Sequence, residues 1–451
     1  MEDSRPNIIF YFSDQQRADT CGCYGQELSI TPNLDRLAAS GVNFLSAFTA
    51  QPVCGPCRAI FQTGKYPTEI GCHRNNKMLP QNIKTLANYI EEAGYETAYI
   101  GKWHLASEGE LEQKPVIDHT ITAVPLEFRG GYTGYWRAAD VLEFTSHGYD
   151  GYIFDENNNR LDFKGYRSDC ITDYALEFFD RYDGKKPFFM TVSHIEPHHQ
   201  NDRKHYEGPD GSKVKYKNYP VPEDLKALGG NHPEEYPDYL GACEAVDQNL
   251  GRLVERLKQD GLYENTVIIY SSDHGCHFKT RNLDGHGYDM YKRTGHDSVL
   301  HVPLVISGGP FLGGISVSQI VSTSSIPKTI LALAGVDVGD AMIGENLLDV
   351  VNGSNSDRLN EAFAQISESK CGRCIRTEDY LYAVYAPNIN GGDIAASDIY
   401  ADDYLYDLHK DPIQLNNVVT NPEYTYVKNK MRKKLLDWIY KAEGVIPKIV
   451  D

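Results

Sequence analysis

Short apolar runs of strand length alternate with helical patterns along the first three quarters of the chain. The clearest runs are residues 7–12, 97–100, 187–193 and 266–271. Between the first two, Thr31-Pro32 opens a helical segment that Gly41 closes, and residues 83–93 read as a helix that Gly94 stops. Strands that alternate with helices predict a mostly parallel sheet with helices on both faces.

Polar residues of the kinds that bind metals or carry protons follow each of these strands. They are Asp14 and Gln15, Lys102 and His104, His194 and His198, and Asp273 and His274. Because ligands in such sheets bind beyond the carboxyl ends of the strands, we expect the four sets to meet at one edge. Two stretches without clear periodicity, residues 107–166 and 200–237, are predicted to be long excursions over that face.

The character of the chain changes after about Gly344. Tyrosine-rich runs at residues 380–385 and 404–408 precede a helical pattern at residues 424–442. The expected fold is therefore α/β, with a large mixed, mostly parallel sheet sandwiched by helices. A smaller C-terminal α+β domain follows, with a short antiparallel sheet and a terminal helix. We place the catalytic domain at residues 1–343 and the smaller domain at residues 344–451.

Charge and hydrophobicity exclude two classes of partner. The 451 residues hold 44 Lys and Arg against 63 Asp and Glu, a net charge of −19, which repels nucleic acids and anionic membranes. No apolar run is long enough to span a membrane, and the acidic start does not look like a signal peptide. The chain is therefore expected to be cytoplasmic, or secreted or periplasmic if a leader has been removed. Its oligomeric state is left open, a homo-oligomer included.

The ten cysteines are too dilute for a disulfide scaffold, but two pairs have the CxxC spacing of redox or metal sites. Cys54-Gly-Pro-Cys57-Arg58 lies in the first half of the chain and Cys371-Gly-Arg-Cys374 in the C-terminal part. One interpretation is a zinc site made from all four thiolates in a protein without catalytic activity.

The first of these segments also resembles a known signature. Cys54 to Arg58, followed by Thr63-Gly64-Lys65, is similar to the Cys-x-Pro-Ser-Arg and Thr-Gly-Lys/Arg motif of the formylglycine-dependent sulfatases, with Cys57 where serine is commonest. These are the type I sulfatases of the alkaline phosphatase superfamily. Further blocks resemble the family in the same order: residues 6–25, 101–105, 272–275, 292, 301–304, and 404–412. The resemblance covers nearly the whole chain and implies an alkaline-phosphatase-like fold and the hydrolysis of a sulfuric ester.

The resemblance also implies the catalytic side chains. In the family, a maturation enzyme oxidises the cysteine at the position of Cys54 to formylglycine, whose hydrate attacks sulfur and later expels sulfate. Arg58 would orient that group. Sulfate ligands and proton carriers would be Lys102, His104, His198 and Lys292. His194 and His199 are alternatives to His198, which would protonate the leaving alcohol, and Lys279 is the alternative to Lys292.

One divalent cation is implied as well. It would be held by Asp14, Gln15, Asp273 and His274, where Gln15 replaces a common aspartate and His274 a common asparagine. Calcium is the first choice because most of these donors are oxygen atoms, although the imidazole also suits Mn²⁺ or Zn²⁺, and Mg²⁺ is an alternative. The cation would polarise the sulfate and lower the pKa of the nucleophile.

The expected substrate is a small sulfated mono- or oligosaccharide, because the net negative charge disfavours the approach of a long polyanion. Candidate sugar-binding residues follow the nucleophile segment: His73, Arg74, Asn75 and Asn76. Aromatic contacts are expected from Tyr132, Tyr135 and Trp136. A phosphonate monoester or phosphodiester hydrolase of the same superfamily is the alternative, because sulfate and phosphate are both tetrahedral.

Overall fold

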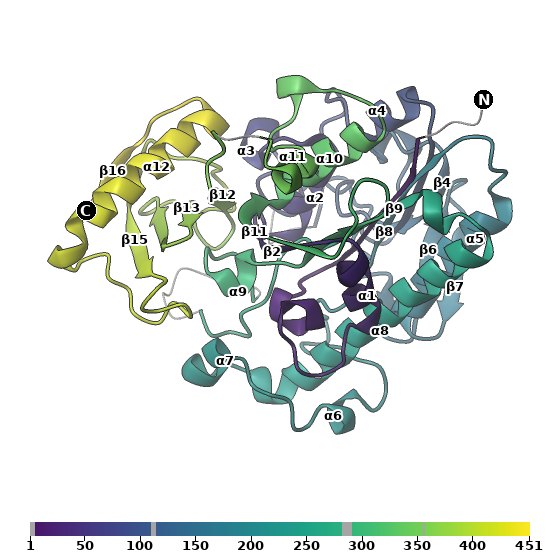
Figure 1. The fold of residues 1–451 in the computed structure, drawn as a ribbon, viewed down its shortest axis with the longest axis horizontal. Helices are drawn as coiled ribbons and strands as arrows, with labels where there is room; N and C mark the ends of the chain where they lie inside the picture. The colour runs from purple at the N-terminus through teal and green to yellow at the C-terminus, as the bar shows by residue number, and fades with distance from the viewer. Residues whose placement is uncertain (1–4, 110–113, 282–290, 355–356) are drawn as a thin grey trace.

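The computed structural model describes residues 5–109, 114–281, 291–354 and 357–451 (Figure 1). Its main feature is an eleven-stranded sheet in which β7 (Arg160–Lys164) pairs only with β6. The other strands lie in the order β11 (Ile315–Ser322), β2 (Val42–Phe48), β10 (Leu304–Ser307), β9 (Thr266–Ser272), β1 (Asn7–Ser13), β8 (Phe188–Ser193), β3 (Glu96–Lys102), β4 (Tyr135–Ala139), β6 (Asp150–Asp155) and β5 (Ser146–His147).

The centre of this sheet is parallel and its margins are mixed. Strands β9, β1, β8, β3 and β4 all run in one direction. Strand β10 is antiparallel to both β9 and β2, so β2 runs the same way as the central strands. The carboxyl ends of β2, β9, β1, β8 and β3 therefore point toward one edge, and the mixed, mostly parallel sheet predicted from the sequence is confirmed.

Helices cover both faces of the sheet, as the alternation within β1 shows. Ile8, Phe10 and Phe12 pack in a core with one set of helices, α2 (Cys54–Thr63), α4 (Leu86–Glu92), α10 (Ile326–Leu333) and α11 (Leu347–Asn352). Ile9 and Tyr11 pack on the opposite face with α1 (Pro32–Ser40), α5 (Arg167–Arg181) and α8 (His232–Gln259). Both faces of β1 are buried, which explains its unbroken run of apolar residues.

A second, smaller sheet lies at the C-terminal end, drawn in light green and yellow in Figure 1. Its strands are β12 (Glu361–Ile366), β13 (Gly372–Thr377), β14 (Tyr380–Tyr385), β15 (Ile399–Asp407) and β16 (Lys448–Val450). The first four are antiparallel, and β16 is parallel to β15. Helix α12 (Thr425–Glu443) packs on β13 and β14. The smaller antiparallel sheet with a terminal helix is confirmed, while the boundary at residues 343 and 344 stays a prediction.

Two local predictions were wrong. Residues 107–166 are not only a loop, because they contain β4 to β7, which extend the sheet. Residues 200–237 contain α6 (Ser212–Lys215), α7 (Glu223–Leu228) and the first turns of α8, a 28-residue helix that was not predicted. Two further short helices are α3 (Pro67–Ile70) and α9 (Asp297–Leu300).

Among the described residues, no helix is both long and apolar enough to cross a membrane.

Candidate active site

The structure brings polar residues from several strand ends into one buried cluster. Asp14 follows β1, Asp273 follows β9, and Lys102 is the last residue of β3. The three side chains are almost completely enclosed. Lys102 Nζ donates to Asp14 Oδ2 at 2.7 Å, so the neighbouring strands β9 and β1 and strand β3, which β8 separates from β1, contribute to one site.

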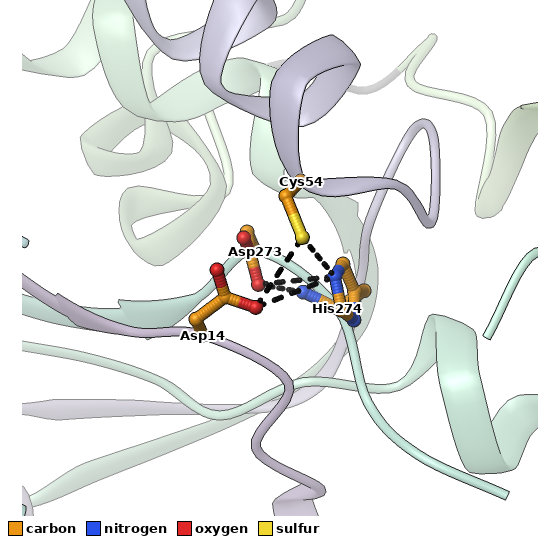
Figure 2. Close-up of side chains that lie close together, drawn as sticks. All are labelled: Asp14, Cys54, Asp273 and His274. Carbon is orange, nitrogen blue, oxygen red and sulfur yellow. Dashed lines mark hydrogen bonds and ion pairs between the residues drawn. The ribbon is translucent and has the colours of Figure 1, made fainter. Parts of the chain in front are cut away.

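Cys54 points into this cluster from the first residue of α2 (Figure 2). Its Sγ atom lies 3.5 Å from Asp14 Oδ1 and 3.3 Å from His274 Nε2, and Lys292 Nζ donates to it at 2.8 Å. Burial alone would raise the pKa of the Cys54 thiol, but the positive charges of Lys102 and Lys292 lower it well below its ordinary value. The site therefore stabilises negative charge at the position of this side chain.

Arg58 joins the cluster one helical turn after Cys54. Its Nη2 donates to Asp14 Oδ2 at 3.0 Å and lies 3.5 Å from Asp273 Oδ2. Its Nη1 donates to the Lys102 carbonyl at 2.8 Å and to Ser193 Oγ at 2.6 Å. Two contacts hold each of the two Nη atoms in the guanidinium plane, which a lysine could not reproduce. Ser193, the last residue of β8, was not identified from the sequence.

Four side chains could hold a metal ion. One ligand atom each from Asp14, Cys54, Asp273 and His274 lies within 4.8 Å of all the others. His274 Nδ1 lies 3.0 Å from the Gly275 carbonyl, which only accepts, so Nδ1 carries a proton and Nε2 is the ring atom that faces the carboxylates and could bind a cation once deprotonated (Figure 2). An oxygen-rich pocket with one imidazole lone pair suits a divalent cation.

Asp273 shows why a cation fits there. Its Oδ2 atom is fully buried and accepts no hydrogen bond from the described residues, and Asp14 is beside it. Burial and the Asp14 charge raise the pKa of Asp273 to about 6. Arg58 and Lys102 donate to Asp14, which leaves Asp273 Oδ2 without a hydrogen-bond donor among the described residues, and a divalent cation would satisfy this buried oxygen.

Gln15 lies beside the carboxylates, but its side-chain amide contacts His199. The residue has the left-handed φ of 71°, and its backbone N–H donates to Asp273 Oδ1 at 3.0 Å. Its Oε1 accepts from the backbone N–H of His199 at 3.3 Å. The backbone of Gln15 thus orients one carboxylate, and metal binding by its side chain stays a prediction.

The geometry distinguishes the alternatives among the lysines and histidines. Lys292 contacts Cys54, whereas Lys279 is exposed over the ring of Tyr291. His198 Nε2 lies 3.0 Å from Lys292 Nζ, and burial together with the Lys292 charge lowers the pKa of His198 to about 3. His194 packs on Tyr11, and His199 interacts with Asn201 and Tyr291, so neither takes the place of His198.

His104 has an unusual backbone that an unpredicted aspartate holds in place. Its φ is 60°, and its ring hydrogen-bonds the Cys54 side chain. Its backbone N–H donates to the Asp140 carbonyl, and the Asp140 carboxylate accepts three backbone N–H groups and one hydroxyl from residues 105–107. Asp140 directly follows β4. Asp14 and Asp273 were identified because each is a polar residue at the end of a predicted strand, and the same criterion applies to Asp140 once β4 is recognised.

The candidate sugar-binding loop packs against the start of α2. Asn75 Oδ1 accepts from the Gly55 N–H at 2.9 Å, and the His73 carbonyl accepts from Gln51 Nε2 at 2.8 Å. Arg74 lies between these two anchored residues. The carbonyl of Asn76 accepts from the Gly109 N–H at 3.0 Å. Residues 73–76 are thus held next to the nucleophile position.

The aromatic contacts expected from the sequence are wrong. Trp136 has no exposed surface, because it lies on β4 and packs in the core against Tyr99 and Trp103. Tyr132 and Tyr135 are buried as well. These rings look like loop aromatics in the sequence, but they form part of the packing between the sheet and its helices.

The four-cysteine zinc site is not formed in the described part of the chain. Cys57 packs beside Thr49 in the core of the large sheet. Cys371 and Cys374 lie in two separate apolar clusters of the smaller sheet. Of these four cysteines, only Cys54 belongs to a metal-capable group among the described residues. All ten cysteines are free thiols in the structure.

Known proteins resemble this chain along most of its length. A family model described as "Sulfatase" matches residues 6–336, and one described as "N-sulphoglucosamine sulphohydrolase, C-terminal" matches residues 285–441. An "Ulvan-active sulfatase" of Formosa agariphila is 29% identical, with 96% of this chain and 81% of the relative covered. An "N-acetylglucosamine-6-O-sulfatase" of Bacteroides thetaiotaomicron is 26% identical, with coverages of 98% and 87%.

Solved structures show the same fold. A putative sulfatase of Bacteroides fragilis superposes with a TM-score of 0.82 at 24% identity, with 98% of this chain and 97% of that chain covered. A phosphonate monoester hydrolase of Agrobacterium radiobacter superposes with a TM-score of 0.71 at 21% identity, with coverages of 97% and 96%. At these identities the superpositions support the architecture alone.

Proposed function

Since this chain belongs to the type I sulfatase family of the alkaline phosphatase superfamily and is a sulfuric ester hydrolase, we propose that it removes sulfate from a sulfated mono- or oligosaccharide. The observation that carries this proposal is the enclosed cluster around Cys54, in which lysine and arginine side chains surround one nucleophile position. The printed names of relatives, an ulvan-active and an N-acetylglucosamine-6-O-sulfatase, support a carbohydrate substrate.

We propose that Cys54 is converted to formylglycine by a maturation enzyme. The hydrated aldehyde would supply a hydroxyl for attack on sulfur and a second hydroxyl for release of sulfate. The start of α2 favours this chemistry, because the positive end of the helix faces the nucleophile. Arg58 would orient the group through its contacts to Asp14 and Ser193, and the His104 ring would hold a proton of the diol.

We propose that the two lysines bind the sulfate group. Lys102 and Lys292 approach the Cys54 position, where an attacked sulfate would hold its charged oxygens. His198 accepts from Lys292, and an anionic ester bound beside it would raise its low pKa. The proposed role of this pair is to deliver a proton to the leaving alcohol oxygen.

The proposed metal ligands are Asp14, Asp273 and His274, with Gln15 beside them. A divalent cation held there would polarise a sulfate oxygen. Calcium is our first choice because the carboxylates supply hard oxygen ligands, with Mn²⁺, Mg²⁺ and Zn²⁺ as alternatives. The structural fit rests on the unsatisfied Asp273 Oδ2 atom and on His274 Nε2, which faces Asp14 and Asp273 and can bind a cation when it is deprotonated.

The experiment compares matched esters on protein whose formylglycine content has been measured. Hydrolysis of 4-nitrophenyl sulfate is followed beside that of 4-nitrophenyl phosphate and a phenylphosphonate ester, and sulfate released from a panel of sulfated saccharides is quantified by ion chromatography. We expect sulfate esters to be hydrolysed with the higher kcat/KM. Faster turnover of the phosphonate ester, or of bis(4-nitrophenyl) phosphate assayed beside it as a phosphodiester, would instead support the alternative of a phosphonate monoester or phosphodiester hydrolase.

A further inference from the structure

Arg74 is a buried arginine without an acidic partner. Eight arginines in the described part of the chain are buried, and six of them form ion pairs with carboxylates, namely Arg17, Arg58, Arg137, Arg167, Arg293 and Arg373. Arg129 instead donates from all three nitrogens and lies over the Trp136 ring. Arg74 is 8% exposed and makes one hydrogen bond, from Nη1 to the Asn75 carbonyl at 3.1 Å.

Two donor nitrogens of Arg74 are unused within the described part of the chain and are not fully enclosed. Its Nε and Nη2 atoms donate to no acceptor among the described residues. Neither atom is fully enclosed, so both remain accessible. An unpaired buried charge is costly, so a ligand that neutralises it gains affinity. The Nε and Nη2 edge of a guanidinium matches the two oxygens of a carboxylate or sulfate.

The neighbours of Arg74 tie its loop to the start of the helix that carries Cys54. His73 before it is tied to Gln51, and Asn75 after it is tied to Gly55, the residue that follows Cys54. The Asn75 backbone N–H also donates to Glu368 Oε1 at 2.6 Å, which connects the loop to the C-terminal part of the chain. Arg74 is not among the side chains that contact Cys54, so it is available to a substrate group other than the sulfate that is cleaved.

We propose that Arg74 selects substrates that carry a second anionic group, a uronate carboxylate or a second sulfate, beside the sulfate ester that is hydrolysed. This inference rests on the proposed function and narrows its substrate class to small sulfated saccharides with at least two negative charges. The net charge of −19 is compatible with this class, because a local cation can attract a small dianion where the overall field repels a long polyanion.

The test measures a ratio of catalytic efficiencies. Sulfated disaccharides are assayed in three forms, with a uronate carboxylate, with that carboxyl reduced to an alcohol, and with a second sulfate in place of it. We expect kcat/KM to be at least about tenfold higher for a dianionic form than for the monoanionic form in the wild type. Arg74→Gln should lower this ratio about tenfold, and Arg74→Lys should retain part of it.

Lys77→Gln is the matched control, because it removes one positive charge from the same loop at a lysine that already pairs with Glu108. It should leave the ratio unchanged. A preference for the carboxylate form or for the disulfated form supports the proposal and tells which anion is bound. No preference in the wild type, an unchanged ratio in Arg74→Gln, or turnover of 4-nitrophenyl sulfate without any saccharide would overturn it. If formylglycine-containing protein hydrolyses no sulfate ester, the proposed function itself fails, and this inference fails with it.

Discussion

Asp140 should be a positioning residue for His104, and Asp140→Asn is the perturbation that tests this. The carboxylate accepts from the N–H groups of Leu105 and Ala106 through Oδ1, and from the N–H and hydroxyl of Ser107 through Oδ2. The distances are between 2.6 and 3.0 Å. These bonds hold a chain segment in which His104 has a positive φ, a conformation that costs about 1–3 kcal/mol for a non-glycine residue.

The expected magnitude follows from these contacts. An asparagine can keep the bonds of one oxygen, but its amide nitrogen would face the backbone N–H of Ser107, which only donates, whereas the Ser107 hydroxyl can turn to accept. Loss of one hydrogen bond to a charged acceptor removes about 1.5–3 kcal/mol and leaves the other donors with a neutral acceptor. This loss is comparable to the strain that the segment holds at His104. A shift of roughly 1 Å in a catalytic side chain can cost about 10²-fold in rate, so we expect kcat to fall about 10²-fold.

The assay is hydrolysis of 4-nitrophenyl sulfate by preparations with equal formylglycine content. Asp118→Asn is the control, because that carboxylate also accepts a backbone N–H within the neighbouring loop but does not contact residues 104–107. In a His104→Ala background, Asp140→Asn should add little, because the two residues act together. A kcat within threefold of the wild type, or full additivity of the two substitutions, would refute the positioning role.

Three further predictions concern the cation cluster, the metal and the smaller sheet. Lys292→Ala should lower kcat/KM on 4-nitrophenyl sulfate by about 10²-fold or more because its Nζ reaches the Cys54 position, whereas the exposed Lys279→Ala should change it less than threefold; equal losses would contradict the assignment. Removal of divalent cations by a chelator should abolish activity and lower Tm, and one calcium ion per chain should restore both; full activity of metal-free protein would exclude the proposed metal site. Glu443→Gln should lower the free energy of unfolding by about 3 kcal/mol in denaturant titrations, because it leaves the enclosed Arg373 without its carboxylate; a loss no larger than that of the exposed Glu423→Gln would argue against the ion pair.

The sequence was informative where a signal is local. An unbroken apolar run can be stable as a strand only when both of its faces are buried, and β1 meets that condition. Parallel strands then place their carboxyl ends together, so Asp14, Lys102 and Asp273 could be assigned to one edge before any geometry was known. The cysteine motif added the nucleophile and Arg58 by resemblance.

Features that depend on tertiary packing could not be predicted from the sequence. His194, His198 and His199 follow the same strand, and only the fold shows which of them reaches Lys292. Trp136 and Asp140 both belong to a region without periodicity that turned out to contain β4. The side chains of β4 are all buried, so the alternation that marks a half-exposed strand is absent there. One error in secondary structure therefore produced a false substrate contact and hid a positioning residue.

The central claim is that Cys54 is the precursor of the nucleophile, and the mass of the proteolytic peptide that contains it tests this most directly. The protein should be purified from its own host, where the maturation enzyme is present. The account predicts an aldehyde mass at Cys54, with unmodified thiol at Cys57, whose side chain is packed in the core. An unmodified thiol at Cys54 in a preparation that hydrolyses sulfate esters would contradict the proposed mechanism.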